Sequence, residues 1–132
     1  MTPLLLAAMA GNIDVVKLLV EKGPAEIDIP TRAGATPLFM AAQKGYLGIV
    51  KYLVEQGANI EAETEAGATP LVVASEKGFL YIVKYLVEEK GANINAGALG
   101  RDRATALLRA RQYSQSAVAK FLEEKGAVER FS

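Results

Sequence analysis

The side chains that most often carry catalysis are missing from this chain of 132 residues, which contains neither histidine nor cysteine. The usual general base, the commonest metal ligand and any thiol or disulfide chemistry are therefore excluded. Carboxylates remain as candidates for acid–base work, and four of them follow a lysine by four residues: Glu21, Glu55, Glu88 and Glu124. That spacing makes charged neighbours on a helix surface, so we interpret these carboxylates as solvated rather than catalytic.

Charge and composition exclude further classes of function. The 15 basic residues balance the 15 acidic ones, which gives no overall attraction to nucleic acid or to an anionic membrane. No phosphate-binding glycine loop is present, and no apolar run reaches the roughly 18 residues of a membrane span. The apolar start MTPLLLAAMA resembles a signal peptide, but it lacks a basic region and recurs within the chain. We therefore expect an intracellular, most simply cytoplasmic, protein without a bound metal.

The strongest pattern in the sequence is an internal repeat. A Thr-Pro-Leu phrase begins at Thr2, Thr36 and Thr69, at intervals of 34 and 33 residues, and a weaker copy begins 36 residues later at Thr105. A second apolar phrase follows each copy. A period of this length predicts a solenoid, in which each unit buries its apolar side against the next. We place four repeats at about 2–34, 35–67, 68–103 and 104–132 and number them one to four.

Repeat two shows what the elements must be. Thr36 can cap a helix with its hydroxyl, and Pro37 suits the first helical position because its missing N–H had no partner there. Gly45 can adopt the left-handed conformation that ends a helix. In the phrase that follows, positions 49, 50, 53 and 54 are apolar and form one helical face. Each repeat is thus predicted to be a pair of short helices, with tight turns at Gly34 and Gly67 between the pairs.

The pattern closely resembles the ankyrin repeat family. The resemblance rests on GATPLFMAAQKGYLGIVKYLVEQGANIEA (34–62) and GATPLVVASEKGFLYIVKYLVEEKGANINA (67–96), in which the period, the TPL phrase and the glycines agree in phase. It implies an all-α solenoid of antiparallel helix pairs with projecting β-turn or hairpin loops. It also implies a concave protein-binding surface, no enzymatic activity and no cofactor.

The sequence departs from the family in three places. The family's histidine after TPL is replaced by apolar residues, and its turn aspartate by Thr31 and Thr64, whose hydroxyls can supply a weaker turn bond. In repeat four the turn glycine is replaced by Arg103 or displaced to Gly100, and Ser114 stands where a glycine should end the helix. This polar repeat is predicted to be a C-terminal cap, with the loop 97–103 as an additional partner contact. Repeat one has an unusually apolar first helix, which suggests either a longer array or a face covered by another molecule.

The resemblance places partner contacts at the loop tips and on the inner face of the first helices. The variable helix-end pairs are expected at Met9-Ala10, Gln43-Lys44, Glu76-Lys77 and Arg111-Gln112. Six positive and three negative residues in the predicted surface favour an acidic partner. Tyr81 is predicted to be exposed, whereas Tyr52 and Tyr85 should be partly packed. The candidate binding residues are Arg32, Ala33, Ala35, Gln43, Lys44, Glu65, Ala66, Ala68, Glu76, Lys77, Arg101, Asp102, Arg103, Arg111 and Gln112.

Two functions are compatible with these patterns. The first is a non-enzymatic module that binds another protein through its concave face and loops. The alternative is an engineered or truncated structural scaffold with no dedicated partner. In either case we expect a monomer that binds neither nucleic acid nor membrane, and weak self-association through the apolar first repeat remains open.

Overall fold

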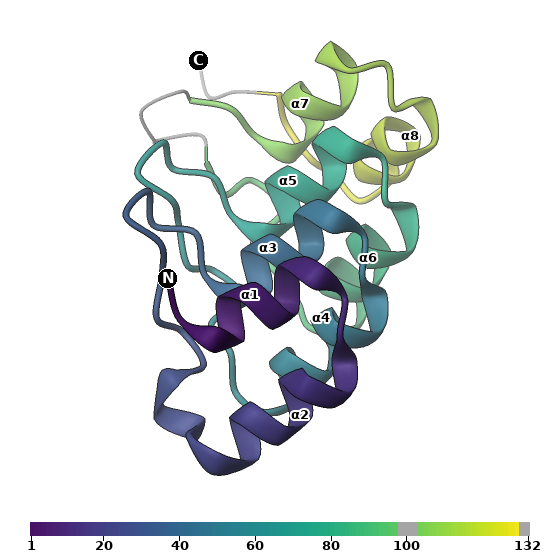
Figure 1. The fold of residues 1–132 in the computed structure, drawn as a ribbon. Coiled ribbons are helices and arrows are strands. Elements are labelled where there is room, and N and C mark those ends of the chain that lie inside the picture. The colour runs from purple at the N-terminus through teal and green to yellow at the C-terminus, as the bar shows by residue number, and fades with distance from the viewer. Residues whose placement is uncertain (98–102, 130–132) are drawn as a thin grey trace.

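The computed structural model describes residues 1–97 and 103–129, which form four consecutive helix pairs stacked side by side (Figure 1). The first helices of the pairs are α1 (Pro3–Ala10), α3 (Pro37–Lys44), α5 (Pro70–Lys77) and α7 (Ala106–Gln112). The second helices are α2 (Ile13–Lys22), α4 (Leu47–Glu55), α6 (Leu80–Lys84) and α8 (Ser116–Glu124). A 3₁₀ turn, η1 (Pro24–Glu26), follows α2, and a π-helical turn, η2 (Tyr85–Glu89), continues α6.

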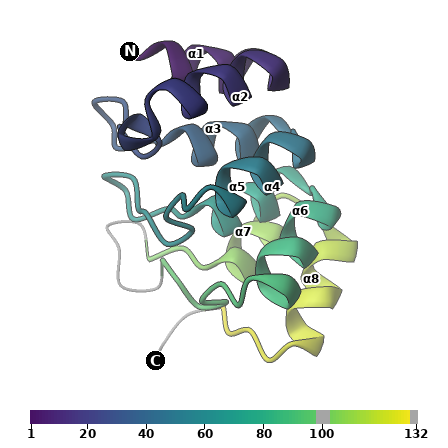
Figure 2. The same cartoon turned by 90° about the horizontal axis from the view of Figure 1, so that it is seen from below.

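The pairs build two layers of helices. The first helices pack on one another in one layer, and the second helices pack on one another in the other layer (Figure 2). The connecting loops gather at the edge where the first helices begin (Figure 1). No β-strand occurs in the part of the chain that the structure describes. The predicted all-α solenoid with projecting loops is therefore confirmed.

The first helices begin and end as predicted. Each is capped by a threonine hydroxyl that accepts a hydrogen bond of 3.1–3.3 Å from the N–H three residues later: Thr2, Thr36, Thr69 and Thr105. Gly11, Gly45 and Gly78 end the first three of these helices with φ between 77° and 83°, in the left-handed region that glycine favours.

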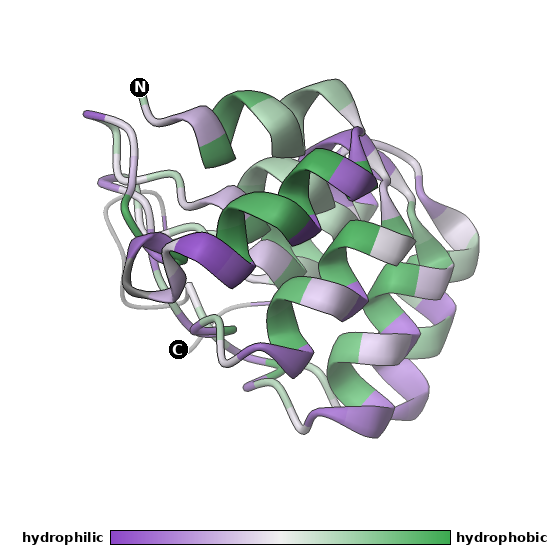
Figure 3. Ribbon diagram, turned by 60° about the horizontal axis from the view of Figure 1, so that its bottom comes forward, coloured by the Kyte–Doolittle hydropathy of each residue, from purple (hydrophilic) through white to green (hydrophobic). Residues whose placement is uncertain are grey.

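The core lies between the two layers. In α4 the side chains of Ile49, Val50 and Leu53 are buried, as the apolar pattern predicted, and in α3 Ala41 and Ala42 have no exposed surface. These small side chains let neighbouring helices approach closely, while each large buried side chain stabilises the fold by about 1.5–3 kcal/mol. Hydrophilic residues are concentrated in the loops and at the helix ends (Figure 3).

Lysines on the second helices tie each repeat to the next. The Nζ atoms of Lys17, Lys51 and Lys84 lie 5.5–5.8 Å from the centres of aromatic rings one repeat further on, which belong to Tyr52, Tyr85 and Phe121 respectively. From the sequence alone, the spacing of four residues indicates only that each lysine neighbours a glutamate on its own helix. Cation–π attraction between repeats is a different role for them, worth about 0.5–1 kcal/mol at exposed sites.

A second set of ties joins the loops. Asp28 accepts a hydrogen bond from the Asn59 N–H at 3.2 Å, and Glu61 accepts one from the Asn93 N–H at 2.7 Å. The equivalent residue in repeat three, Asn95, accepts one from the N–H of Val128 at 2.9 Å. Three different side chains thus supply a hydrogen-bond acceptor at the same place in repeats one, two and three. An exposed loop is held to its neighbour in this way, because the acceptor pairs a backbone donor that the loop itself leaves open.

Repeat three contains one residue more in its second helix than repeats one and two. The phrase reads YLVEEKG where repeat two has YLVEQG. The extra residue is accommodated by η2, a π-helical turn that widens the last turn of the helix. Beyond it the chain returns to register, because Ala92 donates to the carbonyl of Leu86 as Ala58 donates to that of Leu53.

In repeat four, non-glycine residues adopt the left-handed conformation at the turn and at the end of the first helix. Arg103 adopts φ 49° at the place of Gly34 and Gly67, as the first of the two predicted alternatives requires, while Gly100 lies outside the described residues. Ser114 adopts φ 58° at the place of Gly45. The Thr105 hydroxyl also donates toward the carbonyls of Val128 and Glu129, at 2.9 and 2.7 Å, which fastens the C-terminal segment to the start of α7.

Candidate functional site

The tips of the first two inter-repeat loops are held in place by backbone hydrogen bonds. In the first loop the Thr31 N–H donates to the Ala35 carbonyl at 2.9 Å, and the Thr31 hydroxyl accepts from the Ala35 N–H at 3.2 Å. The second loop repeats both bonds between Thr64 and Ala68. The predicted role of the threonines in the turn is thus confirmed.

These loops present a small set of exposed residues. Arg32, Ala33 and Glu65 are exposed at the tips, and Ala66 is half-buried. The Glu65 N–H donates to the Ala33 carbonyl at 2.8 Å, so the two tips are also bonded to each other. A partner would meet a preformed edge, without the cost of ordering two separate loops.

Two alanines of the predicted binding surface pack against the core instead of lying exposed. Ala35 is buried in the core with 7% of its surface exposed, and Ala68 is half-buried against the same core. Both close their loops through the hydrogen bonds to Thr31 and Thr64. The prediction that Ala35 lies on the binding surface is therefore not supported, because a residue that closes the loop turns its side chain inward.

The third loop is described only at its ends. The predicted contacts Arg101 and Asp102 lie outside the described residues. Arg103 is exposed, next to the buried Ala104.

The ends of the first helices supply the second part of the predicted surface. Lys44 and Lys77 are exposed, and Gln43 and Glu76 are half-buried beside them. Glu76 lies 3.9 Å from both Lys77 and Arg109, so it joins the ends of α5 and α7. Gln115 adds a hydrogen bond of 3.0 Å from its side-chain amide to the Glu76 carbonyl.

In repeat four the expected helix-end pair is displaced by one residue. The Ser114 N–H donates to the Arg111 carbonyl as the Gly45 N–H donates to that of Ala42. Arg111 therefore stands where Ala42 is buried, and the true counterparts of Gln43 and Lys44 are Gln112 and Tyr113. Tyr113 is 54% exposed. Sequence reasoning missed it, although Thr105 and Ser114 fix the register of this repeat and place Tyr113 at the position of Lys44.

Arg111 also forms ion pairs with two glutamates of its own repeat. Its guanidinium pairs with Glu123 at 2.8 Å and with Glu129 at 2.5 Å. These two hydrogen bonds raise the pKa of Arg111 above its usual range. The positive charge predicted for the surface is therefore smaller. Without Arg111, the described members of the surface include four basic residues and two acidic residues, which gives a net charge of about +2. The basic residues are Arg32, Lys44, Lys77 and Arg103, and the acidic ones are Glu65 and Glu76.

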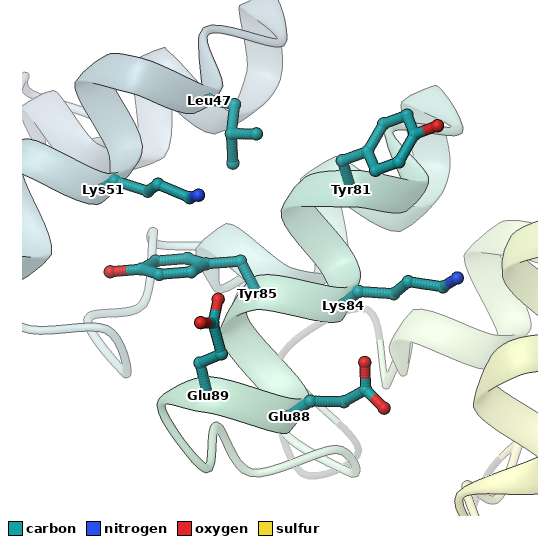
Figure 4. A pocket seen from close by; sticks show the side chains of 7 residues that line it. All are labelled: Leu47, Lys51, Tyr81, Lys84, Tyr85, Glu88 and Glu89. Carbon is teal, nitrogen blue, oxygen red and sulfur yellow. The ribbon is translucent and has the colours of Figure 1, made fainter.

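A pocket of about 220 Å³ lies on the other side of the molecule, between α4 and the second helix of repeat three (Figure 4). Leu47 and Tyr81 form its apolar rim, and Tyr81 is 77% exposed, as predicted. The side chain of Lys51 lies over the ring of Tyr85 (Figure 4). The charged residues that complete the lining are Lys84, Glu88 and Glu89.

Tyr85 is buried at this place, which confirms its predicted packing, and its hydroxyl has no hydrogen-bond partner among the described residues. Burial raises the pKa of the Tyr85 phenol, and the nearby carboxylates of Glu55 and Glu89 raise it further. A phenol held in its neutral form beside charged, solvated side chains is no catalytic base at neutral pH.

Neither a metal centre nor a membrane span emerges from the described residues. No group of three or more acidic side chains among them is arranged to hold a metal ion. None of the described helices has the length and apolar character needed to cross a bilayer.

Comparison with known families gives one match. The family model described as ankyrin repeats (3 copies) matches residues 1–64 and 57–129. Together these segments cover nearly the whole chain and all four helix pairs. No curated protein matches the sequence.

Proposed function

The chain belongs to the ankyrin repeat family, whose members generally serve as protein–protein interaction modules, and we propose that it binds another protein through one surface. That surface consists of the loop tips and the exposed ends of the first helices, which form the concave side in this family. We call it the recognition surface. Its described members are Arg32, Ala33, Glu65, Ala66, Gln43, Lys44, Glu76, Lys77, Arg103, Gln112 and Tyr113.

The observation that carries the proposal is the contrast between neighbouring positions in each repeat. The threonine caps of α3, α5 and α7 and the alanines of α3 and α5 are buried and nearly constant. The position at the end of each first helix is exposed and varies, from Ala10 in repeat one through Lys44 and Lys77 to Tyr113 in repeat four. A scaffold needs only the first set. The second set lies along consecutive helices at one edge of the stack, where a single partner can touch several repeats at once.

The surface is preformed, which favours binding. The tips are joined by the bond from Glu65 to Ala33, and Glu76 links the ends of α5 and α7. Little conformational entropy is then lost when a partner docks. The excess positive charge favours an acidic patch on that partner, and Tyr113 is the aromatic residue best suited to anchor it.

The test is affinity capture with three forms of the protein as bait. The wild-type chain is compared with a variant of the recognition surface, R32E/K44E/K77E. It is also compared with a control variant, K51E/K84E, which changes two lysines that line the pocket on the other side of the molecule. The proposal expects proteins that the wild type and the control retain and the surface variant loses. It expects their association with the wild type to slow as salt is raised, because screening weakens charge steering.

Two results would argue against the proposal. Proteins retained equally by all three baits would remove the recognition surface from the interaction. A chain that retains no specific protein would favour the alternative of a structural scaffold without a partner. We also expect an intracellular, cytoplasmic setting for the interaction, which localisation of a tagged chain would check.

A further inference from the structure

The outer side of repeat one exposes apolar side chains whose counterparts in the other repeats are buried or half-buried. Leu6 of α1 is 55% exposed, while its counterpart Val73 is 5% exposed. Val15 is 37% exposed, although the equivalent residues in the other three repeats are at most 2% exposed: Ile49, Ile82 and Val118. Leu18 is 49% exposed, and its counterparts Tyr85 and Phe121 are buried.

In the later repeats, positions equivalent to this side of repeat one touch the preceding repeat. Arg109, the counterpart of Leu6, approaches Glu76 of repeat three at 3.9 Å. Lys125, the counterpart of Lys22, pairs with Glu88 of repeat three at 3.2 Å. A Cβ added to Gly48, the counterpart of Asp14, would lie 3.5 Å from Ile13 of repeat one.

By this equivalence one side of repeat one is an interface surface that no other described repeat covers, and we call it the end face. It carries Leu6, Asp14, Val15, Leu18 and Lys22. It lies at the top of the stack in Figure 2, on α1 and α2.

The opposite end of the stack does not complement the end face. Where α3 and α5 present the buried Ala42 and Ser75 to the next repeat, α7 presents Arg111, paired with Glu123 and Glu129. Ser114 carries a side chain where Gly45 and Gly78 allow a residue of the next repeat to lie against the backbone. Copies of this chain therefore cannot continue the solenoid head to tail.

The end face is, however, complementary to itself. Asp14, Leu18 and Lys22 are spaced by four residues and lie along one stripe of α2. If the α2 helix of a second copy lies antiparallel across this stripe, with Leu18 against Leu18, Asp14 of each copy comes opposite Lys22 of the other. Opposite charges then flank an apolar centre at both ends, which is the arrangement that a two-fold axis requires.

From this pattern we propose that two copies of the chain associate through the end face as a symmetric dimer, with their α2 helices antiparallel about Leu18. The contact removes Leu6, Val15 and Leu18 from water. Stable interfaces bury roughly 800 Å² on each partner, and three exposed apolar side chains per copy support a weak dimer, with dissociation on the order of micromolar or above.

Sedimentation of the purified chain over a wide concentration range tests the proposal. The wild type should pass from monomer to dimer without larger species. D14K places two lysines opposite each other at both ends of the contact, and K22D does the same with two aspartates, so each should weaken dimerisation by about tenfold or more. The double variant D14K/K22D exchanges the charges and should restore the dimer, which a merely structural effect of either residue would not do.

Two further variants guard against misinterpretation. L18K should abolish the dimer, whereas Y81K, a change at an exposed aromatic residue outside the end face, should leave it intact. Circular dichroism at the same concentrations identifies any variant that fails to fold. A wild type that stays monomeric, a dimer that is unaffected by D14K or L18K, or growth into larger assemblies would each overturn the proposal.

Discussion

The ring of Phe79 in repeat three lies against the backbone of Gly45 in repeat two, so closely that a Cβ added to Gly45 would come within 2.7 Å of the ring's Cζ atom. Tyr46 stands in the same relation to Gly11. The glycine thus serves two purposes, since it also ends α3 with a φ of 83°. One residue type satisfies both the end of a helix and the close stacking of repeats.

This double role predicts the cost of replacing it. Gly45→Ala should lower the free energy of unfolding by about 2–4 kcal/mol, because left-handed strain and the clash with Phe79 add. Gly57→Ala is the matched control. Gly57 has φ 98°, and none of the described residues has an atom within 4 Å of a Cβ added there, so only strain of about 1–2 kcal/mol is expected. Urea denaturation measures both; equal losses would contradict the role of the ring.

The buried hydroxyl of Tyr85 predicts a dependence of stability on pH. Its pKa is raised in the folded state by burial and then by Glu55 and Glu89. Above about pH 10 the unfolded chain loses the phenol proton while the folded chain keeps it, so stability falls as the pH rises. Tyr85→Phe should reduce this alkaline loss.

At neutral pH the same substitution removes a buried donor that has no partner among the described residues, so it should be neutral or stabilise the fold by about 1 kcal/mol. Tyr81→Phe is the control, because Tyr81 is 77% exposed and its hydroxyl stays in water. Thermal unfolding at pH 7 and at pH values above 10 compares the three proteins. If Tyr85→Phe lost stability at pH 7, the hydroxyl would have a partner after all.

The hydrogen bond from the Val128 N–H to Asn95 predicts which substitutions this loop accepts. Asn95→Ala removes the acceptor and should cost about 1 kcal/mol. Asn95→Asp keeps an oxygen in place, as Asp28 does in repeat one, and should cost less than half as much. Glu63→Ala, at an exposed position of a loop, is the control for a general effect of truncation. Similar unfolding free energies for the alanine and aspartate variants of Asn95 would count against the bond.

Much of this fold could be predicted because its signals are local. A threonine cap, a proline in the first turn and a left-handed glycine each act within a few residues, and repetition of the pattern fixed the helix pairs. The candidate site was less predictable where those signals fail. In repeat four the helix-end pair was placed one residue too early, although Thr105 and Ser114 fix the register, so Arg111 was included and Tyr113 was overlooked.

Other features depend on contacts between repeats, which spacing along one helix does not reveal. The lysines of the second helices were interpreted as neighbours of glutamates, and the structure shows them over aromatic rings of the following repeat. The family resemblance predicts Ala35 on the binding surface, but its side chain is buried. Its burial follows from the two hydrogen bonds with Thr31, which turn the chain back toward the core.

The π-helical turn at Tyr85–Glu89 has a consequence for how such a protein changes over time. An added residue in an ordinary α-helix rotates everything after it by about 100°, which would turn the next loop away from its neighbours. Here the turn absorbs the addition, and Ala92 and the acceptor Asn95 keep their places. Single-residue insertions at the ends of second helices can therefore accumulate one at a time, each reshaping the outer surface while the stacking of the array is inherited unchanged.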